Sequence, residues 1–362
     1  MRILELVDTL EFGGTERLVV ELARSLQALG HQLHVVCLRR TGPLARPLTE
    51  AGIDTVTLNK PDGPDLRALL DFTTFVRSRR IDVVHTHNPL VHHYGLVGAR
   101  MARVPVVVNT IHGLRNLSRQ IGAKEVLYGL ACRFSDRIVA VCPMAHRVFA
   151  AGKVIPRSKL ITINNGIRLE PFLQLKPRGL CADFVFGIIG RLDPVKDHRS
   201  LLQAFAIVLR QHQQCRLEIL GDGPERVRLE QLAQELNIAH RVLFRGFSNE
   251  VAEFLQGVDA AVQCSTSEAL PLGVLEAMGA ARLVIGTAVG GVQDLIEIAA
   301  CGWLCPPSEP QLLAAAMSKA VSASAQEREQ MGRRGRAYAL AEYSLPRMTS
   351  AYEQLFQQLL AA

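Results

Sequence analysis

Two glutamates, Glu268 and Glu276, stand eight positions apart across a junction between a loop and an expected helix. Pro271 has the fixed φ that suits the first position of a helix, so we predict a helix over 272–281 and place Glu268 in the loop before it. The free amides of the first turn lie at the positive end of the helix dipole and favour phosphate and sugar oxygens. These amides belong to Leu272, Gly273 and Val274. The segment therefore suits a sugar joined to a phosphate, although a carboxylate near a helix start is also a common partner of the helix dipole.

Two cations follow an apolar, β-rich run over 184–189 that is expected to be a strand. The run ends at Gly190, and Arg191 and Lys196 come next. A guanidinium can bind two phosphate oxygens at once and an ammonium adds a compact charge, so the pair could neutralise a diphosphate leaving group without a metal ion. The alternative is that each cation only forms an ion pair with a neighbouring acid, Asp193 or Asp197.

Ordered motifs run along most of the chain. In the C-terminal half they are Gly190-Arg191 with Lys196, Gly221-Asp222-Gly223-Pro224, the segment from Glu268 to Glu276, and Gly290-Gly291 before Asp294. In the N-terminal half they are Gly13-Gly14-Thr15-Glu16, His85-Thr86-His87-Asn88, Asn109-Thr110-Ile111-His112-Gly113 and Asn165-Gly166-Ile167. With these motifs the chain resembles the retaining glycosyltransferases of family four. The resemblance implies an α/β protein with the GT-B fold, in which two Rossmann-like parallel-sheet domains face each other across a cleft that holds the active site.

Residue roles follow from the resemblance and from the demands of glycosyl transfer, in which cleavage leaves negative charge on the diphosphate and positive charge on the sugar. We predict that Arg191 and Lys196 meet the leaving group. The resemblance places Glu268 and His112 beside the donor sugar and assigns the ribose hydroxyls to Glu276. Whether Glu268 acts as a nucleophile stays open. Glycines at turns let the backbone approach a donor or acceptor, with a plain tight turn as the alternative; they are Gly13, Gly14 and Gly190.

Four histidines in the N-terminal half raise the question of a metal ion. His85 and His87 share one face of an expected strand, but no third ligand is visible in the sequence. The chain also contains no D-x-D triplet, which fits cationic rather than metal-based stabilisation of a diphosphate. We therefore expect no metal site and no cofactor, with a nucleotide-diphosphate sugar as the donor substrate. The other two histidines are His92 and His93.

Hydrophobic periodicity organises the chain into two rounds of alternating strands and helices. Strands are predicted over 3–7, 33–38, 54–58, 81–86, 106–110, 137–141 and 160–163, and again over 184–189, 216–220, 241–246, 260–263 and 283–287. Helices are predicted over 16–29, 66–79, 91–103, 119–134 and 145–152, and again over 199–209, 225–236 and 272–281. Such alternation indicates right-handed βαβ units and parallel sheets.

The point where this cycle restarts sets the predicted domain boundaries. Residues 1–167 form an N-terminal, acceptor-binding domain, and residues 181–343 form a nucleotide-sugar-binding domain. Between them, 168–180 contains two prolines and a glycine and is predicted to be a hinge linker. An amphipathic pattern over 344–362 predicts a terminal helix, which by the resemblance returns to the N-terminal domain.

Composition fits a protein with two cores. The chain has 362 residues, more than a single core usually supports, and 48% of them are hydrophobic. No transmembrane helix is readable, and acids within the apolar start at 1–8 indicate a buried first strand instead of a signal peptide. The eight cysteines include no C-x-x-C pair, so we expect reduced, buried thiols and a cytoplasmic protein.

Positive charge is concentrated in the N-terminal half, because residues 1–167 carry a balance of +9 and residues 168–362 a balance of −2. One basic stretch with interleaved apolar residues holds Arg115, Arg119, Lys124, Arg133 and Arg137. This stretch predicts peripheral docking on anionic lipid at the inner face of the cytoplasmic membrane, with a solvated basic face as the alternative. Nucleic acid is not expected as a partner, because no reading motif or aromatic stacking platform accompanies the charge.

We therefore predict a retaining, metal-independent glycosyltransferase. It would move a hexosyl or N-acetylhexosaminyl group from a nucleotide-diphosphate sugar to a glycan or lipid-linked acceptor in the synthesis of a cell-surface polysaccharide or glycolipid. Two alternatives stay open. A nucleotide-sugar epimerase of the same architecture would turn over the donor without an acceptor. A non-catalytic sugar- or lipid-binding protein on the same fold is the second alternative, although the intact set of cations and glutamates argues against it.

Overall fold

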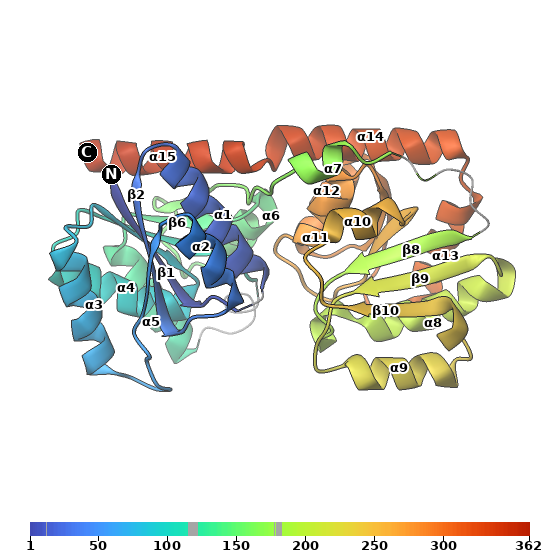
Figure 1. Ribbon diagram of the computed structural model, residues 1–362, viewed down its shortest axis with the longest axis horizontal. Helices are drawn as coiled ribbons and strands as arrows, with labels where there is room; N and C mark the ends of the chain where they lie inside the picture. The colour runs from blue at the N-terminus through green and yellow to red at the C-terminus, as the bar shows by residue number, and fades with distance from the viewer. Residues whose placement is uncertain (12, 115–121, 177, 179–182) are drawn as a thin grey trace. The chain divides into compact units, whose positions relative to one another are not determined.

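The computed structural model describes residues 1–11, 13–114, 122–176, 178 and 183–362. The chain divides into two compact units, which are Met1–Ile167 together with Ser344–Ala362, and Arg168–Tyr343. Each unit is a parallel sheet with helices on both faces (Figure 1). Among the described residues, no helix combines the length and the apolarity needed to cross a bilayer.

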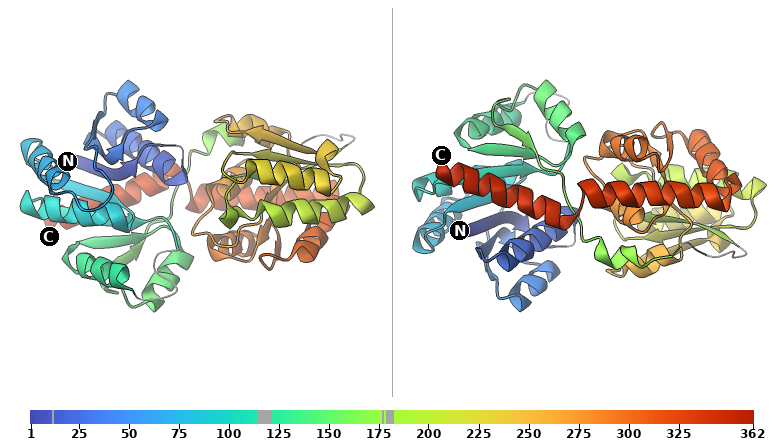
Figure 2. Two further views of the ribbon diagram at one scale, coloured as in Figure 1. Left: turned by 90° about the horizontal axis from the view of Figure 1, so that it is seen from below. Right: turned by 90° about the horizontal axis from the view of Figure 1, so that it is seen from above.

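In the described part of the N-terminal unit, seven strands form one sheet in the order β3-β2-β1-β4-β5-β6-β7. The strands are Arg2–Thr9 (β1), Gln32–Arg40 (β2), Asp54–Thr57 (β3), Val83–His87 (β4), Val106–Ile111 (β5), Arg137–Ala140 (β6) and Leu160–Thr162 (β7). The helices are Gly14–Ala28 (α1), Arg46–Glu50 (α2), Leu66–Ser78 (α3), Pro89–Met101 (α4), Ala123–Phe134 (α5), Pro143–Ala151 (α6) and the C-terminal Leu345–Ala361 (α15). Helix α15 packs against α1 and over β5, while α3, α4 and α5 form the layer on the other face (Figure 2).

The C-terminal unit repeats this plan with the order β10-β9-β8-β11-β12-β13. Its strands are Phe184–Ile189 (β8), Cys215–Leu220 (β9), Val242–Gly246 (β10), Ala260–Gln263 (β11), Leu283–Thr287 (β12) and Gly302–Cys305 (β13). Its helices are Glu170–Leu173 (α7), His198–Gln211 (α8), Arg226–Glu235 (α9), Val251–Gln256 (α10), Leu272–Gly279 (α11), Gly290–Ala299 (α12), Pro310–Ser322 (α13) and Ala325–Glu342 (α14). Two short 3-10 turns, Pro194–Lys196 (η2) and Ala239–Arg241 (η3), complete it.

Strand order locates the functional edge of each sheet. In both sheets the order reverses beside the first strand, between β1 and β4 in one unit and between β8 and β11 in the other. In open parallel sheets, ligands bind outside the carboxyl ends of the strands at this switch point. The residues that follow β1, β4, β8 and β11 are therefore the first places to look for a site.

Alternation along β1 and β4 gives the two faces of the N-terminal sheet different characters. Leu4, Leu6 and Val84 belong to the apolar core that also contains side chains of α3 and α4. The intervening residues point to the opposite face, because successive side chains of a strand alternate. There the buried residues Glu5 and His85 are polar, and the ring of His85 lies 4.9 Å from that of Tyr352 in α15.

The predicted strands and most predicted helices are confirmed. Each predicted strand is present with its ends displaced by at most two residues, and the alternation into two parallel sheets is as expected. The predicted start of α5 at 119 lies outside the described residues. The seven described cysteines are free and buried as expected, and Cys181 lies outside the described residues.

Several helix ends differ from the prediction by one or two residues, and helix α11 shows why. Pro271 is the residue before α11, with an extended backbone (φ −79°, ψ 115°), and the helix begins at Leu272. The carbonyl of Pro271 accepts a hydrogen bond from the amide of Val274 (3.2 Å). Proline lacks an amide donor but keeps this carbonyl acceptor. The helix ends at Gly279 and not at 281, since Ala281 adopts a left-handed conformation (φ 53°) that cannot continue it.

Most elements that the sequence did not reveal lie in the last third of the chain. Strand β13 and helices α10, α12, α13 and α14 were not predicted there, nor were the short helices α2 and α7 earlier in the chain. Helix α14 is mostly polar, and the residues it buries include Gly332 and Gly335. A Cβ at Gly332 would lie 2.0 Å from the carbonyl oxygen of Ala281, so the helix packs by close backbone approach. It therefore lacks the large apolar stripe that periodicity detects.

The segment expected to be a linker is largely packed. Residues 168–176 contain α7, which contacts α11. The guanidinium of Arg336 donates to the carbonyls of Phe172 (3.3 Å), Leu173 (3.3 Å) and Leu175 (3.1 Å), so this part of the chain is held to the C-terminal unit. The predicted linker residues 177, 179 and 180 lie outside the described residues.

Candidate active site

Lys196 and Glu268 meet at the switch point of the C-terminal sheet. Lys196 ends the turn η2 that follows β8, and Glu268 stands in the loop that follows β11. The ammonium of Lys196 forms an ion pair with Oε1 of Glu268. The two side chains are 21% and 12% exposed, so the pair is mostly withdrawn from water but still reachable.

Asp193 and Asp197, considered above as ion-pair partners of Arg191 and Lys196, instead accept hydrogen bonds from backbone amides. The carboxylate of Asp193 accepts from the amides of Val195 (3.0 Å) and Lys196 (3.3 Å) and so caps η2. Asp197 adopts a left-handed conformation (φ 50°, ψ 42°) and caps α8 by accepting from the amide of Ser200 (3.2 Å). Both acids thus shape the loop that presents Lys196.

Glu268 is held by two further side chains that sequence reasoning missed. The hydroxyl of Ser265 (2.8 Å) and the amide of Gln263 (3.2 Å) both donate to Oε1, the oxygen that also meets Lys196. Gln263 additionally donates to the hydroxyl of Ser265 (2.6 Å). Their proximity to Glu268 in the sequence was the available signal. All three donors bind Oε1 of Glu268, and none of the described residues donates to Oε2. Oε2 is therefore the carboxylate oxygen that a ligand could bind.

Glycines at the end of β9 let two loops approach closely. A Cβ at Gly221, which has φ +153°, would lie 1.9 Å from the carbonyl oxygen of Gly190. A Cβ at Gly223 would lie 2.4 Å from the carbonyl oxygen of Leu192. By contrast, a Cβ at Gly190 would meet only the flexible side chain of Lys196 at 3.7 Å, so packing does not require glycine at that position.

Arg191 is exposed, and no hydrogen bond or ion pair of its side chain occurs in the described part of the chain. The guanidinium is therefore available to an anion. Of the three predicted first-turn amides of α11, that of Val274 is engaged with Pro271, whereas those of Leu272 and Gly273 have no backbone hydrogen bond among the described residues. A Cβ at Gly273 would lie 3.0 Å from the carbonyl oxygen of Ile189, so the start of α11 adjoins the end of β8.

Glu276 lies on the second turn of α11 and is 2% exposed. At the N-terminal start of α12, the amide of Gly291 donates to the carbonyl of Ala269 (3.0 Å), which fixes the loop between Glu268 and α11 from the other side.

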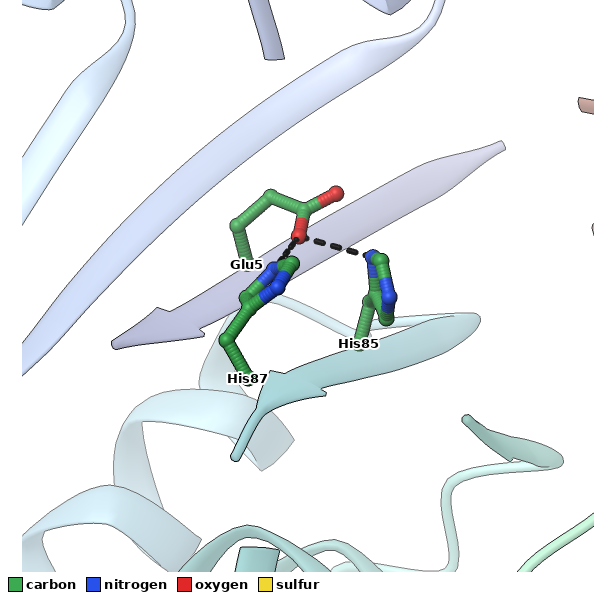
Figure 3. Close-up of side chains that lie close together, drawn as sticks. All are labelled: Glu5, His85 and His87. Atoms are coloured by element: carbon green, nitrogen blue, oxygen red, sulfur yellow. Dashed lines mark hydrogen bonds and ion pairs between the residues drawn. The ribbon is translucent and has the colours of Figure 1, made fainter. Parts of the chain in front are cut away.

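A second polar cluster lies at the switch point of the N-terminal sheet. Oε2 of Glu5 in β1 is 2.9 Å from Nδ1 of His85 and 2.6 Å from Nε2 of His87, both in β4 (Figure 3). All three side chains are buried. The sequence analysis did not identify Glu5 as a third member beside His85 and His87. An acidic residue inside an apolar strand was the available signal for it. It is brought there by the register of the sheet, in which Glu5 pairs with His85.

These three groups could be considered as ligands of a metal ion. Their separations are those of hydrogen bonds, however. Two ligands at about 2.1 Å from one tetrahedral ion would be roughly 3.4 Å apart, so the present spacing suits a proton between oxygen and nitrogen better than a metal. The expectation of no metal at His85 and His87 stays a prediction. His92 lies elsewhere, between Thr86 (2.8 Å) and Ser135 (2.8 Å).

His112 follows β5 and joins this cluster. Its Nε2 lies 3.0 Å from Nδ1 of His87, and its amide donates to the side-chain oxygen of Asn88 (3.0 Å). Nδ1 of His112 is buried and has no hydrogen-bond partner among the described residues. An unsatisfied buried acceptor or donor costs about 1–3 kcal/mol, which a bound ligand could recover.

Burial and mutual contact set the charges of this cluster. Burial by itself raises the pKa of Glu5, but the charge and hydrogen bonds of His85 and His87 outweigh it and lower that pKa to about 2. Burial, assisted by His85 and opposed by Glu5, lowers the pKa of His87 to about 4. Burial together with His87 and His85 holds the pKa of His112 well below its usual value. At neutral pH Glu5 is therefore ionised, and His87 and His112 are neutral.

The glycines before α1 already face a carboxylate of the chain. Gly14 begins α1, and a Cβ at Gly13 would lie 2.0 Å from Oε2 of Glu16. Burial raises the pKa of Glu16, with Asp8 adding to the effect and a backbone hydrogen bond opposing it. An anion of the protein thus lies at this helix start, so the surface at Gly13 and Gly14 suits hydroxyl groups better than a diphosphate.

Helix α5 carries an unusual exposed surface, here named the α5 patch. Its large apolar side chains are 49% to 63% exposed, and they are Val126, Leu127, Leu130 and Phe134. Lys124 and Arg133 of the same helix are also exposed, while Tyr128 is buried against the sheet side. Of the other predicted members, Arg137 begins β6 and donates to the carbonyl of Asp136 (2.7 Å), while Arg115 and Arg119 lie outside the described residues.

Comparisons with known proteins agree with this geometry. A family model described as Glycosyltransferase Family 4 matches residues 12–171, and one described as Glycosyl transferases group 1 matches residues 181–338. The UDP-Gal:alpha-D-GlcNAc-diphosphoundecaprenol alpha-1,3-galactosyltransferase of Escherichia coli is 25% identical over 304 residues, which is 78% of each chain. The N-acetyl-alpha-D-glucosaminyl L-malate synthase of Bacillus anthracis is 24% identical over 96% of this chain and 94% of its own.

Solved structures share the architecture. Anabaena HepE in complex with UDP-glucose aligns with a TM-score of 0.86 at 20% identity, covering 99% of this chain and all of the other. The lipopolysaccharide outer core galactosyltransferase WaaB aligns with a TM-score of 0.76 at 17% identity. This likeness confirms the predicted GT-B fold of two Rossmann-like sheets. Because the two family models match consecutive halves and together span most of the sequence, the chain belongs to the group 1, family 4 glycosyltransferases, retaining enzymes that use a nucleotide sugar.

Proposed function

We propose that the protein transfers a hexosyl or N-acetylhexosaminyl group from a nucleotide-diphosphate sugar to a glycan or lipid-linked acceptor, in the synthesis of a cell-surface polysaccharide or glycolipid, without a metal ion. The observation that carries this proposal is the pair of Lys196 and Glu268 at the switch point of the C-terminal sheet, with the unpaired guanidinium of Arg191 nearby in the sequence and at the same strand end.

The leaving group is the first requirement of this reaction. The ammonium of Lys196 has three donor hydrogens and uses one on Glu268, so it can also bind a phosphate oxygen. Arg191 supplies a second, planar donor, and the amides of Leu272 and Gly273 add the positive end of a helix dipole. Together these groups stabilise negative charge as it develops on the diphosphate.

Glu268 orients the donor sugar in this proposal. Its Oε1 is saturated by Lys196, Ser265 and Gln263, so the free Oε2 can accept from sugar hydroxyls and face positive charge at the anomeric carbon. A carboxylate neutralised in this way is a weaker nucleophile, which favours positioning over covalent catalysis. Glu276 binds the ribose hydroxyls, and Gly190 allows the donor to approach the backbone.

Within the N-terminal unit, His112 is the residue proposed to bind a sugar hydroxyl, and Gly13 and Gly14 are proposed to bind hydroxyls of the donor or the acceptor. A lipid-linked acceptor is supported by two independent observations. The printed name of the E. coli relative specifies an acceptor on diphosphoundecaprenol. The α5 patch combines exposed apolar side chains with the cations Lys124 and Arg133, which is the chemistry of peripheral binding to anionic lipid at the inner face of the cytoplasmic membrane.

A screen for the donor followed by product analysis tests this function. UDP-, GDP-, ADP- and dTDP-sugars are added in a thermal-shift assay, in which a ligand at 100 times its Kd stabilises by about 2.7 kcal/mol. The stabilising donor is then incubated with undecaprenyl-linked acceptors, with and without chelator, and the anomeric proton of the product is examined by NMR. We expect one nucleotide class to stabilise the protein and an α-linked donor to yield an α-linked product in chelator. Stabilisation by none of them, a β-linked product, or strict dependence on a divalent ion would contradict the proposal.

A further inference from the structure

The cluster around His112 contains a chain of hydrogen bonds that starts from an anion. It runs from Oε2 of Glu5 to Nε2 of His87 over 2.6 Å, and from Nδ1 of His87 to Nε2 of His112 over 3.0 Å. Strands β1, β4 and β5 are neighbours in the sheet; Glu5 lies within β1, His87 ends β4 and His112 follows β5. At its far end, Nδ1 of His112 is buried without a partner among the described residues.

The proton positions along this chain follow from the charges. Glu5 is ionised at neutral pH, so its oxygen can only accept, and Nε2 of His87 must carry the proton between them. His87 is neutral and has one ring proton, which leaves a lone pair on Nδ1. Nε2 of His112 must therefore donate to that lone pair. Since His112 is also neutral, its only ring proton is used, and Nδ1 carries a lone pair.

We propose that Glu5 and His87 are positioning residues that hold His112 in the tautomer with a proton on Nε2, so that its Nδ1 accepts a hydrogen bond from a hydroxyl of the donor sugar. The part that concerns the sugar rests on the function proposed above. An acceptor at this position binds hydroxyl groups and rejects phosphate oxygens, which are acceptors themselves. His112 thus selects the sugar portion of the donor and not its diphosphate.

Two other buried atoms of the cluster, Oε1 of Glu5 and Nδ1 of His85, also have no geometrically satisfied hydrogen bond among the described residues. His85 lies beside Glu5, and its Nε2 bonds to the hydroxyl of Thr110 (2.8 Å), which in turn meets the hydroxyl of Tyr352 (2.8 Å) from α15. These contacts enclose Glu5 and His87 but do not touch His112. They keep water away from the carboxylate, which strengthens its hold on the proton of His87.

The tautomer of His112 can be measured in the free protein, without any sugar. Long-range proton–nitrogen correlation spectra of protein labelled at histidine distinguish a protonated from an unprotonated ring nitrogen, and the spectrum of His112→Gln identifies the signals. We expect Nε2 to be protonated and Nδ1 not. A proton on Nδ1 in the wild type would overturn the proposal. So would a stoichiometric divalent ion found by elemental analysis of the purified protein, because it would occupy Glu5, His85 and His87.

Three variants separate positioning from a merely structural role. His87→Phe removes the acceptor for His112, and Glu5→Leu removes the anion one step earlier, so both should give a mixture of the two His112 tautomers. His87→Asn keeps an oxygen near the former Nδ1 and should restore the wild-type tautomer. The matched control is His92→Phe, which removes another buried, neutral histidine with two hydrogen bonds but leaves this chain intact. An unchanged tautomer in both His87→Phe and Glu5→Leu, or an equal change in His92→Phe, would refute the proposal.

Transfer assays with the donor identified by the screen test the sugar contact. Losing one neutral hydrogen bond to the substrate should lower kcat/KM about tenfold in His87→Phe, while His87→Asn and His92→Phe should stay within about twofold of the wild type. A shifted tautomer with unchanged kcat/KM in His87→Phe would show that Nδ1 does not contact the donor sugar. If the wild type transferred no sugar at all, the proposed function would fail, but the tautomer measurement would still decide the role of Glu5 and His87.

Discussion

The ion pair of Lys196 and Glu268 should stabilise the C-terminal unit as well as serve the reaction. Three variants measure its contribution: Lys196→Met, which removes the ammonium but keeps most of the aliphatic side chain, Glu268→Gln, which keeps an oxygen for Ser265, and the double variant. In Lys196→Met the carboxylate would face only two neutral donors, Ser265 and Gln263. The double variant removes both charges, so it should be less destabilised than the two single effects combined.

The magnitude follows from the exposure of the two side chains. Breaking a fully buried pair costs about 3–5 kcal/mol, and breaking an exposed one about 0.2–1 kcal/mol. With 21% and 12% exposed, this pair lies between the two cases, so we expect about 2 kcal/mol for Lys196→Met and a coupling free energy of about 1–2 kcal/mol. At a urea dependence of about 2 kcal/mol per molar, Lys196→Met should lower the unfolding midpoint by about 1 M.

Tryptophan fluorescence gives a selective assay. The single tryptophan, Trp303, lies in β13 and packs against the core of the C-terminal unit, so its signal follows the unfolding of this unit in urea. The matched control is the pair of Glu329 and Arg333 on α14, whose side chains are 41% and 74% exposed. The same double-mutant cycle there should give less than about 0.5 kcal/mol. The reasoning is wrong if the coupling between Lys196 and Glu268 does not exceed that of the control pair.

Four further predictions concern single residues. Burial, with the charge of Lys196 adding to it, lowers the pKa of His198 to about 4, against about 6.5 when unfolded, so the folded state binds fewer protons. The stability of the C-terminal unit should therefore be complete above pH 6.5 and fall by about 1.4 kcal/mol per pH unit below it. His198→Leu should abolish this pH dependence in the Trp303 assay. Arg191→Ala should lower transfer at least ~100-fold while leaving the urea midpoint unchanged, because the side chain has no partner among the described residues; near-normal turnover would remove it from the leaving-group site. Gly221→Ala should destabilise the C-terminal unit by more than about 1 kcal/mol, since its Cβ would overlap a backbone carbonyl and its φ is +153°; an unchanged midpoint would contradict the close approach of the two loops. Leu127→Glu, on the exposed face of α5, should reduce sedimentation with anionic vesicles at low salt but not the hydrolysis of a soluble donor, and equal sedimentation of variant and wild type would leave the α5 patch without a membrane role.

Local patterns in the sequence were sufficient for all described strands except β13. Both sheets are covered by helices on two faces, so their strands appear as short apolar runs, and such runs predicted each expected strand to within two residues at its ends. The same criterion failed for α14, because that helix packs through Gly332 and Gly335 and shows no large apolar stripe. It also failed for β13, although the equally short edge strands β3 and β7 were predicted.

The site was predicted as separate residues and not as an arrangement. Lys196 and Glu268 were identified individually, but they are 72 positions apart, and the sequence suggested nearby aspartates as partners of the cations. Their contact depends on β8 and β11 being neighbours at the point where the strand order reverses. Neither that adjacency nor the convergence of Ser265 and Gln263 on a single oxygen is contained in local spacing.

The sequence by itself determined which residue types stand at the strand ends and where the chain turns from strand to helix, because periodicity, glycine and proline act over a few neighbouring positions. The tertiary structure alone decided which of those residues are partners and which are charged. Glu5 shows the difference, since in the sequence it is one acid in an apolar strand, 82 positions before His87. Parallel pairing of β1 with β4 places it beside two histidines, and the cluster then holds an ionised carboxylate next to the neutral ring of His87.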